Sequence, residues 1–379
     1  MSARTSNGLG IATRVFGSQW FVSVLAVLIA FAIGAILIAL SGASVLDAYY
    51  AMFRGSIVDP NAATFVRQIK PLTDSLFYSI PLIISGLGLA LGFRAGLFNI
   101  GGKGQIIVGA LAAVWVGFSM DLPPVVHTFV AVAAAIIAGA AYAGIAGVLK
   151  AKTGANEVIV TIMLNSIATL GLGYVLAQKA WQVPGSNQPV TPKVAESAAL
   201  TRLLPAPFKL HVGFIVALVA LAFFWWLIER STLGFQIRAV GANAAAARTA
   251  GISVERITAI TMVLSGAFLG LAGANEALGT IGYVSRDVAG TVGFDAITVA
   301  LLGRNKTWGT FGAGLLFGAF KAGGYTMQAK GVPIDMILIL QSVIVLLIAA
   351  PALVRWLFRL PDVRALAAQT RKGNADEHK

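Results

Sequence analysis

Apolar residues in this sequence gather into long runs that are separated by short polar segments. The longest runs cover residues 20–40, 76–91, 106–118, 125–149, 158–177, 212–228, 257–278, 308–320 and 334–356. An α-helix rises about 1.5 Å per residue, so about 20 apolar residues cross the hydrocarbon core of a membrane. A shorter run, Val292–Leu302, contains Asp295 and is expected to form a short or broken helix. The pattern predicts an all-α polytopic membrane protein with about ten transmembrane helices.

The composition agrees with a membrane protein. The chain has 379 residues, of which 58% are hydrophobic and only 11% are charged, and its mean hydropathy is +0.83. Soluble domains carry about 25% charged residues. The absence of cysteine excludes a disulfide framework and a metal site built on cysteine. The first apolar run is also longer than the core of a cleaved signal peptide, which has about 7–15 residues.

Positive charge is distributed as expected for a protein with both ends in the cytoplasm. The net charge is +13, which in a soluble protein would suggest a nucleic-acid partner. With about ten crossings and the N-terminus inside, most of the 28 Lys and Arg residues fall on the cytoplasmic side. We therefore expect a cytoplasmic N-terminus at 1–19, a transmembrane domain at 20–357 and a cytoplasmic tail at 358–379. The chain would lie in a bacterial-type plasma (inner) membrane, in contact with lipid and not with nucleic acid.

A glycine-rich polar segment, GLFNIGGKGQIIVGA at residues 96–110, separates two apolar runs. A phosphate-binding loop needs the pattern G-x-x-x-x-G-K-[ST] between a strand and a helix. Here Lys103 is followed by Gly104 and Gln105, and no other stretch offers the pattern. The chain is therefore not expected to bind nucleotide or to hydrolyse ATP itself.

The same segment is better explained as a break between two membrane helices at the cytoplasmic face. Gly101, Gly102 and Gly104 permit backbone angles that a regular helix does not support. Non-helical backbone at membrane depth is tolerated where it is buried in protein or lines a watery cavity. Asn99 and Gln105 are therefore candidates to line an inner translocation pathway, and plain turn chemistry is the alternative.

Glycine also recurs at four-residue intervals inside the apolar runs. The sets are Gly88, Gly92 and Gly96, then Gly266 and Gly270, then Gly314 and Gly318. Residues four apart share one face of a helix, so these positions make smooth faces on which neighbouring backbones can approach closely. Tight packing explains them, and such faces also suit helices that slide or rock.

The segment 231–256 gives the clearest prediction of an element outside the membrane. Asn243 can accept hydrogen bonds from the first turn of a helix, and the alanine-rich residues 244–250 have high helix propensity. Gly251 can end that helix in a left-handed conformation. A helix this short is marginal alone, so it must rest on another surface. That surface is either the membrane or a cytoplasmic partner.

Polar residues inside a membrane are costly and are therefore functional candidates. Asn165, Asn275 and Glu276 lie in apolar runs, and amide groups can hydrogen-bond a base edge or sugar hydroxyls. Phe98 offers a ring that could stack on a base or on a sugar face. These four residues join the two amides of the helix break as pathway candidates. Interhelical hydrogen bonding or packing is the alternative for each.

Four blocks of the sequence, in order, resemble the permease subunits of ABC importers for nucleosides and simple sugars, within the branched-chain amino acid/ribose permease superfamily. They are the segment at 96–110, KTGANEVIVTIMLNSIA at 152–168, RAVGANAAAARTAGI at 238–252 and GFDAITVALLGRNKTWGTFGAGLLFGA at 293–319. The resemblance covers roughly residues 70–355. It departs at Lys103, where the family often has an acidic residue.

The resemblance implies a transport subunit and not an enzyme. Such a permease pairs with a second, homologous permease and rests on ABC ATPase subunits that bind ATP and Mg. A substrate-binding lipoprotein or a periplasmic binding protein would deliver the solute, and this chain itself would bind no cofactor and no metal. The helix in 231–256 would be the coupling helix. The residues that would couple it to the ATPase are Asn243, Ala246, Ala247, Arg248 and Gly251.

Two other transport functions stay open. An ion-coupled secondary transporter of a small polar solute would need an ionisable relay in the membrane, and the sequence offers little beyond Glu276, Asp295 and Lys321. The other is an ABC permease for branched-chain amino acids. A membrane enzyme is disfavoured, because the sequence shows no nucleophile–base pair and no histidine pair at metal-ligand spacing. Nucleosides are the first expectation for the solute, followed by pentoses or hexoses.

Overall fold

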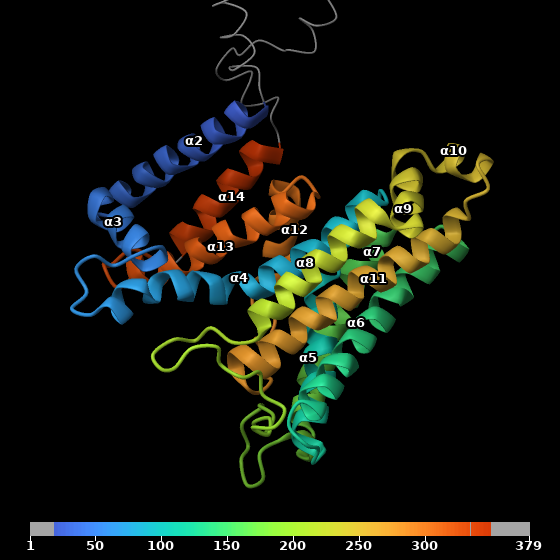
Figure 1. The fold of residues 1–379 in the computed structure, drawn as a ribbon, viewed down its shortest axis with the longest axis horizontal. Coiled ribbons are helices and arrows are strands. Elements are labelled where there is room, and N and C mark those ends of the chain that lie inside the picture. The colour runs from blue at the N-terminus through green and yellow to red at the C-terminus, as the bar shows by residue number, and fades with distance from the viewer. Residues whose placement is uncertain (1–18, 334, 350–379) are drawn as a thin grey trace, which may run out of the picture. The chain divides into compact units, whose positions relative to one another are not determined.

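The computed structural model describes residues 19–333 and 335–349, and its regular elements are helices (Figure 1). In chain order they are α2 (Gln19–Leu40), α3 (Val45–Ser56), α4 (Phe65–Arg94), α5 (Gly102–Ser119), α6 (Val126–Thr153), α7 (Glu157–Ala177), η1 (Lys179–Trp181), α8 (Gly213–Arg230), α9 (Thr232–Ala242), α10 (Ala244–Thr249), α11 (Val254–Asn275), η2 (Glu276–Ile281), α12 (Val292–Leu302), α13 (Thr307–Gln328) and α14 (Asp335–Ala349). Within the described residues there is no β-strand, and one isolated bridge pairs Arg202 with His211. The predicted all-α class is confirmed.

Six helices of the described ranges are long and apolar enough to cross a membrane: α4, α5, α6, α7, α8 and α11 with η2. Two shorter apolar helices add to them, Val27–Leu40 within α2 and α12. The bounds of α12 are those of the short run that the sequence predicted. The total of about ten spans stays a prediction. The chain ends, predicted to be cytoplasmic, lie outside the described residues at 1–18 and 350–379.

The chain forms two compact units. One contains Met1–Ala51 and Gly324–Lys379, and in it α2 packs against α14. The other, Met52–Gly323, contains the predicted sites. In this larger unit α11 is the central helix, because it packs against α6, α5 and α4.

Helix α4 begins at Phe65, well before the apolar run that starts at residue 76. Its first turns mix charged and polar residues with apolar ones, and hydrogen bonds within these turns help to stabilise the helix. The Thr64 hydroxyl accepts a hydrogen bond from the Arg67 N–H at 3.4 Å, and Lys70 pairs with Asp74 one turn later. Caps and pairs four residues apart support a helical turn that is not part of a continuous apolar run. The connection between the apolar runs at 20–40 and 76–91 therefore contains α3 and the first turns of α4.

Glycines let α6 and α11 approach closely. A Cβ atom placed on Gly266 would lie 2.3 Å from the carbonyl oxygen of Gly139, and one on Gly270 would lie 2.2 Å from that of Ala135. These distances are shorter than any real Cβ contact, so the backbones occupy the space that a side chain would need. The predicted packing face is confirmed for Gly266 and Gly270. It is wrong for Gly96, which lies beyond the end of α4.

Candidate functional site

The loop between α8 and α11 contains two helices, of which the sequence predicted one. Helix α9 begins directly after α8, where the Ser231 hydroxyl accepts a hydrogen bond from the Gly234 N–H at 2.9 Å. Near its other end, Gly241 lies so close to α4 that an added Cβ would be 2.0 Å from the Arg94 carbonyl oxygen. Helix α9 is therefore seated on the end of α4, where it provides a support for the next helix.

Helix α10 has the two caps that the sequence predicted. The Asn243 side-chain oxygen accepts a hydrogen bond from the Ala246 N–H at 3.0 Å. Gly251 has a φ of +82°, and the Ile252 N–H donates to the Ala247 carbonyl oxygen at 3.0 Å. This is a left-handed helix end of the kind that glycine favours. The helix ends at Thr249, one residue earlier than the predicted 244–250.

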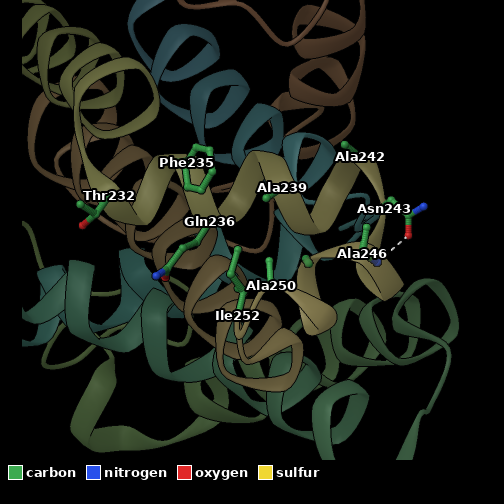
Figure 2. A pocket seen from close by; sticks show the side chains of 10 residues that line it. Thr232, Phe235, Gln236, Ala239, Ala242, Asn243, Ala246, Ala250 and Ile252 are labelled. Carbon is green, nitrogen blue, oxygen red and sulfur yellow. Dashed lines mark hydrogen bonds between the residues drawn. The ribbon is translucent and has the colours of Figure 1, made fainter.

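An apolar groove lies between α9 and α10 (Figure 2). Its volume is about 550 Å³, and it is lined by Thr232, Phe235, Gln236, Ala239, Ala242, Asn243, Ala246, Ala247, Ala250 and Ile252. Phe235 is 60% exposed and Ala246 and Ala250 are exposed as well, whereas Ala247 is only 4% exposed. An exposed apolar groove of this kind is a candidate site for a protein partner. Ala247 instead holds α10 against its support.

Arg248, unlike Ala246 and Ala247, does not line the groove. Its guanidinium forms an ion pair with the Glu255 carboxylate at 2.7 Å, and both side chains are more than half exposed. An exposed pair contributes little to stability. The five predicted coupling residues therefore divide into two caps, one buried alanine, one exposed alanine of the groove and one exposed cation.

The helix break near residue 100 has its left-handed backbone at a position that the sequence did not predict. Gly96 has a φ of +73°, whereas Gly101 has a φ of −71°, and Gly102 and Gly104 lie inside α5. The assignment of unusual backbone angles to these last three glycines is wrong. They are required for close approach instead, since a Cβ on Gly102 would lie 3.0 Å from the Gly293 carbonyl oxygen.

The two amides of the break, Asn99 and Gln105, bind each other. Asn99 Nδ2 donates to Gln105 Oε1 at 3.1 Å and to the Ser265 hydroxyl at 3.0 Å, and Gln105 Nε2 donates back to Asn99 Oδ1 at 3.1 Å. Both side chains are 1% exposed. The network joins the break to α11, and a buried network that is satisfied in this way makes the local structure rigid.

Asn165 fixes the same break from α7. Its Nδ2 donates to the Ile100 carbonyl oxygen and its Oδ1 accepts from the Gly104 N–H, both at 2.8 Å. Phe98 is 38% exposed, and its ring lies 4.8 Å from that of Phe93. The structure thus brings Asn99, Gln105 and Asn165 to the same helix break, the first two bonded to each other and the third to the backbone of the break, with Phe98 exposed in the same segment.

Asn275 lies in a second polar region, at the far end of α11. It is 3% exposed, and neither atom of its side-chain amide has a hydrogen-bond partner in the described structure. A Cβ on Gly213 would lie 2.1 Å from Asn275 Oδ1 and 2.5 Å from the His211 ring, so the amide and the imidazole lie side by side. Asn275 is followed by η2, a π-helix, and π-helical turns are frequent at functional sites.

His211 is the residue of this region that sequence reasoning missed. Its Nδ1 accepts a hydrogen bond from the Gly213 N–H at 3.0 Å, so Nε2 carries the proton of the neutral ring. That Nε2 is buried and has no partner in the described structure. Burial lowers the pKa of His211 to about 4, which keeps the ring neutral near pH 7. Its position beside Asn275 depends on contacts between distant segments, which no local pattern reveals.

Glu276, which follows Asn275 directly, is within electrostatic range of an ionisable residue of another element. Glu276 is 8% exposed, and Lys321 on α13 acts electrostatically on both Glu276 and Asp295. The Lys321 ammonium lies 5.9 Å from the centre of the Tyr78 ring on α4. The Thr291 hydroxyl donates to Asp295 Oδ2 at 2.6 Å. No group of metal-ligating side chains is present among the residues that the structure describes.

The sequence was compared with known proteins. Residues 72–349 match the family model described as the permease component of branched-chain amino acid transport systems. The chain belongs to this permease family. The permease is 40% identical to the guanosine ABC transporter permease protein NupP of Bacillus subtilis, over 89% of this chain and 95% of the relative. It is 35% identical to the glucose ABC transporter permease protein TsgB13 of Haloferax volcanii, over 85% of each chain.

A third relative extends the comparison over a greater share of the permease. The nucleoside ABC transporter permease protein NupB of Lactococcus lactis is 29% identical over 92% of this chain and 94% of its own length. No solved structure matches the permease. The match over residues 72–349 lies inside the predicted extent of the family resemblance and confirms it.

Proposed function

We propose that the permease is a membrane subunit of an ABC importer that carries nucleosides, with simple sugars as the second class of solute. The observation that carries the proposal is the capped helix α10 with its exposed apolar groove, in a chain of this permease family. The names of two relatives, at 40% and 29% identity, specify guanosine and nucleoside, which favours nucleosides over branched-chain amino acids.

In this proposal α10 is the coupling helix. The ATPase subunit holds ATP and Mg and binds in the groove between α9 and α10. Closure of the ATPase pair moves α10, and α9 transmits the movement to the end of α4, against which it is packed. A second, homologous permease would form the other wall of the pathway, and a binding protein would deliver the solute from outside.

The solute pathway in this proposal passes the region of Asn275 and Glu276. An amide with both atoms buried and unpartnered can serve a polar solute without first breaking a bond to the protein. The His211 Nε2–H adds a donor at the same place. We rank three other proposed pathway residues below Asn275 and Glu276, because their amides already bind other parts of the permease. They are Asn99, Gln105 and Asn165.

Two leucine substitutions test this ranking. Asn165→Leu leaves the Gly104 N–H and the Ile100 carbonyl oxygen unpaired, so the free energy of unfolding falls by about 2–4 kcal/mol. Asn275→Leu removes no hydrogen bond within the described structure and leaves the folded amount unchanged. It raises the KM for uptake about tenfold, because the solute loses polar contacts. The measurements are thermal unfolding in detergent and initial uptake rates at matched expression; an unchanged KM would exclude Asn275 from the pathway.

The function itself is tested by uptake of radiolabelled guanosine into vesicles that contain the permease with an ABC ATPase, a second permease and a binding protein. We expect uptake that requires ATP and is inhibited by unlabelled nucleosides more strongly than by ribose, glucose or leucine. Uptake driven by an ion gradient without ATP would instead establish the ion-coupled alternative. Strong inhibition by leucine alone would establish the branched-chain amino acid alternative.

A further inference from the structure

A second cavity lies where the ends of α4 and α8 meet the start of α13. Its volume is about 660 Å³, and its lining includes Arg94, Arg230, Lys306, Glu229, Trp225 and Trp308. None of these residues belongs to the groove beside α10 or to the proposed solute pathway. Helix α8 leads directly into α9, so the cavity lies at the end of the bundle that carries the coupling loop.

The cavity has an excess of positive charge. Three cations and one carboxylate line it, and the closest approach between the Arg94 guanidinium and Glu229 is 4.0 Å. Arg94 is further held by the hydrogen bond from its Nε to the Asn305 carbonyl oxygen at 2.7 Å. In the described structure neither Arg230 nor Lys306 forms an ion pair with a carboxylate. The cavity therefore suits an anion.

Two tryptophans place this anion at the surface of the membrane. Trp308 is 69% exposed and Trp225 is 40% exposed, and the Arg230 guanidinium lies 5.4 Å from the centre of the Trp225 ring. Tryptophan is enriched where lipid headgroups meet the hydrocarbon core, because its ring is apolar and its N–H is polar. A free anion in water needs no apolar neighbours of this kind, whereas the glycerol and upper acyl chain of a lipid do.

We propose that this cavity binds the phosphate of an anionic phospholipid on the cytoplasmic side of the membrane. Arg230 and Lys306 contact the phosphate oxygens, Arg94 forms the inner wall, and the two tryptophans flank the first carbons of the acyl chains. Because Lys306 begins the connection into α13 and Arg94 ends α4, a bound lipid ties together the ends of helices that are distant in sequence. The cytoplasmic side rests on the proposed function, which places the coupling loop there, whereas lipid binding itself does not depend on the identity of the solute.

The test uses the purified permease in a neutral detergent, with phosphatidylglycerol, phosphatidylcholine or inorganic phosphate added at matched concentrations. We expect phosphatidylglycerol to raise the Tm and the other two to leave it unchanged. The double variant Arg230→Gln with Lys306→Gln should bind phosphatidylglycerol about 10- to 30-fold more weakly. The matched control is Lys152→Gln with Arg256→Gln, which removes the same charge from exposed positions at the coupling-loop end and should stay within about twofold of the wild type.

Three results would overturn the proposal. Equal protection by inorganic phosphate would identify a free anion as the ligand. Equal loss of lipid affinity in both double variants would identify diffuse attraction to a basic surface. Unchanged lipid affinity in Arg230→Gln with Lys306→Gln, combined with weaker binding of the ATPase, would identify a protein contact. If the double variant does not fold, native mass spectrometry of the single variant Lys306→Gln replaces it: fewer retained phosphatidylglycerol molecules than in the wild type support the proposal, and an equal number overturns it.

Discussion

Ala246→Arg is expected to lower ATP-dependent uptake about a hundredfold while leaving the amount of folded permease unchanged. Ala246 is exposed on α10 and lines the groove, so an arginine there fills the space that the ATPase would occupy. The cap of the helix survives, because Asn243 accepts its hydrogen bond from the backbone of residue 246 and not from its side chain. Uptake and ATPase stimulation are measured on the same membranes.

The matched control is Ala245→Arg, which places the same side chain one position away and outside the groove lining. We expect it to retain most of the uptake, so the pair separates loss of a docking surface from a general effect of added charge. Ala247 is less suitable for this test because it is 4% exposed, and a large side chain there would displace α10 itself. Normal uptake in Ala246→Arg would exclude the proposed docking role of the groove.

Local signals explain what the sequence predicted correctly in this loop. Asn243 and Gly251 cap a helix through bonds to residues three to five positions away, so their pattern is visible in a short window. Helix α9 was missed because its packing against the end of α4 joins Gly241 to the Arg94 carbonyl, which are far apart in the sequence. The groove exists only because both helices are present, so the sequence predicted three of its lining residues, Asn243, Ala246 and Ala247, but neither the residues from α9 nor its shape.

The polar residues of the bundle also show that a local sequence pattern does not reveal contacts between distant segments. The sequence predicted Asn165 and Asn275 equally as pathway residues, because each is an asparagine within an apolar run. The structure distinguishes them by their hydrogen bonds. The side-chain oxygen and nitrogen of Asn165 each have a partner, and those of Asn275 have none in the described structure. His211 could not be linked to Asn275 without the fold. Hydropathy also placed the start of α4 too late, since it does not register the caps and ion pairs that extend a helix beyond its apolar run.

Close helix packing is where a small change should have the largest effect on stability. We expect Gly266→Ala to lower the free energy of unfolding by about 3 kcal/mol, because its new Cβ would lie 2.3 Å from the Gly139 carbonyl oxygen. That oxygen belongs to the backbone and cannot move without separating α6 from α11. A loss of this size is a large part of the 5–15 kcal/mol or so that stabilises a typical protein.

Gly171→Ala is the matched control, since it is the same substitution in α7 at a position where an added Cβ meets nothing within 4 Å. There the change should stabilise the permease by roughly 0.5–1 kcal/mol, because alanine favours a helix more than glycine does. Thermal unfolding of both variants in one detergent gives the comparison. A Cβ on Gly266 would also lie 2.3 Å from the Ala143 side chain. Even so, adding Ala143→Gly to Gly266→Ala should not restore the lost free energy of unfolding. Full restoration would show that side-chain crowding, and not the approach of the two backbones, sets the distance between α6 and α11.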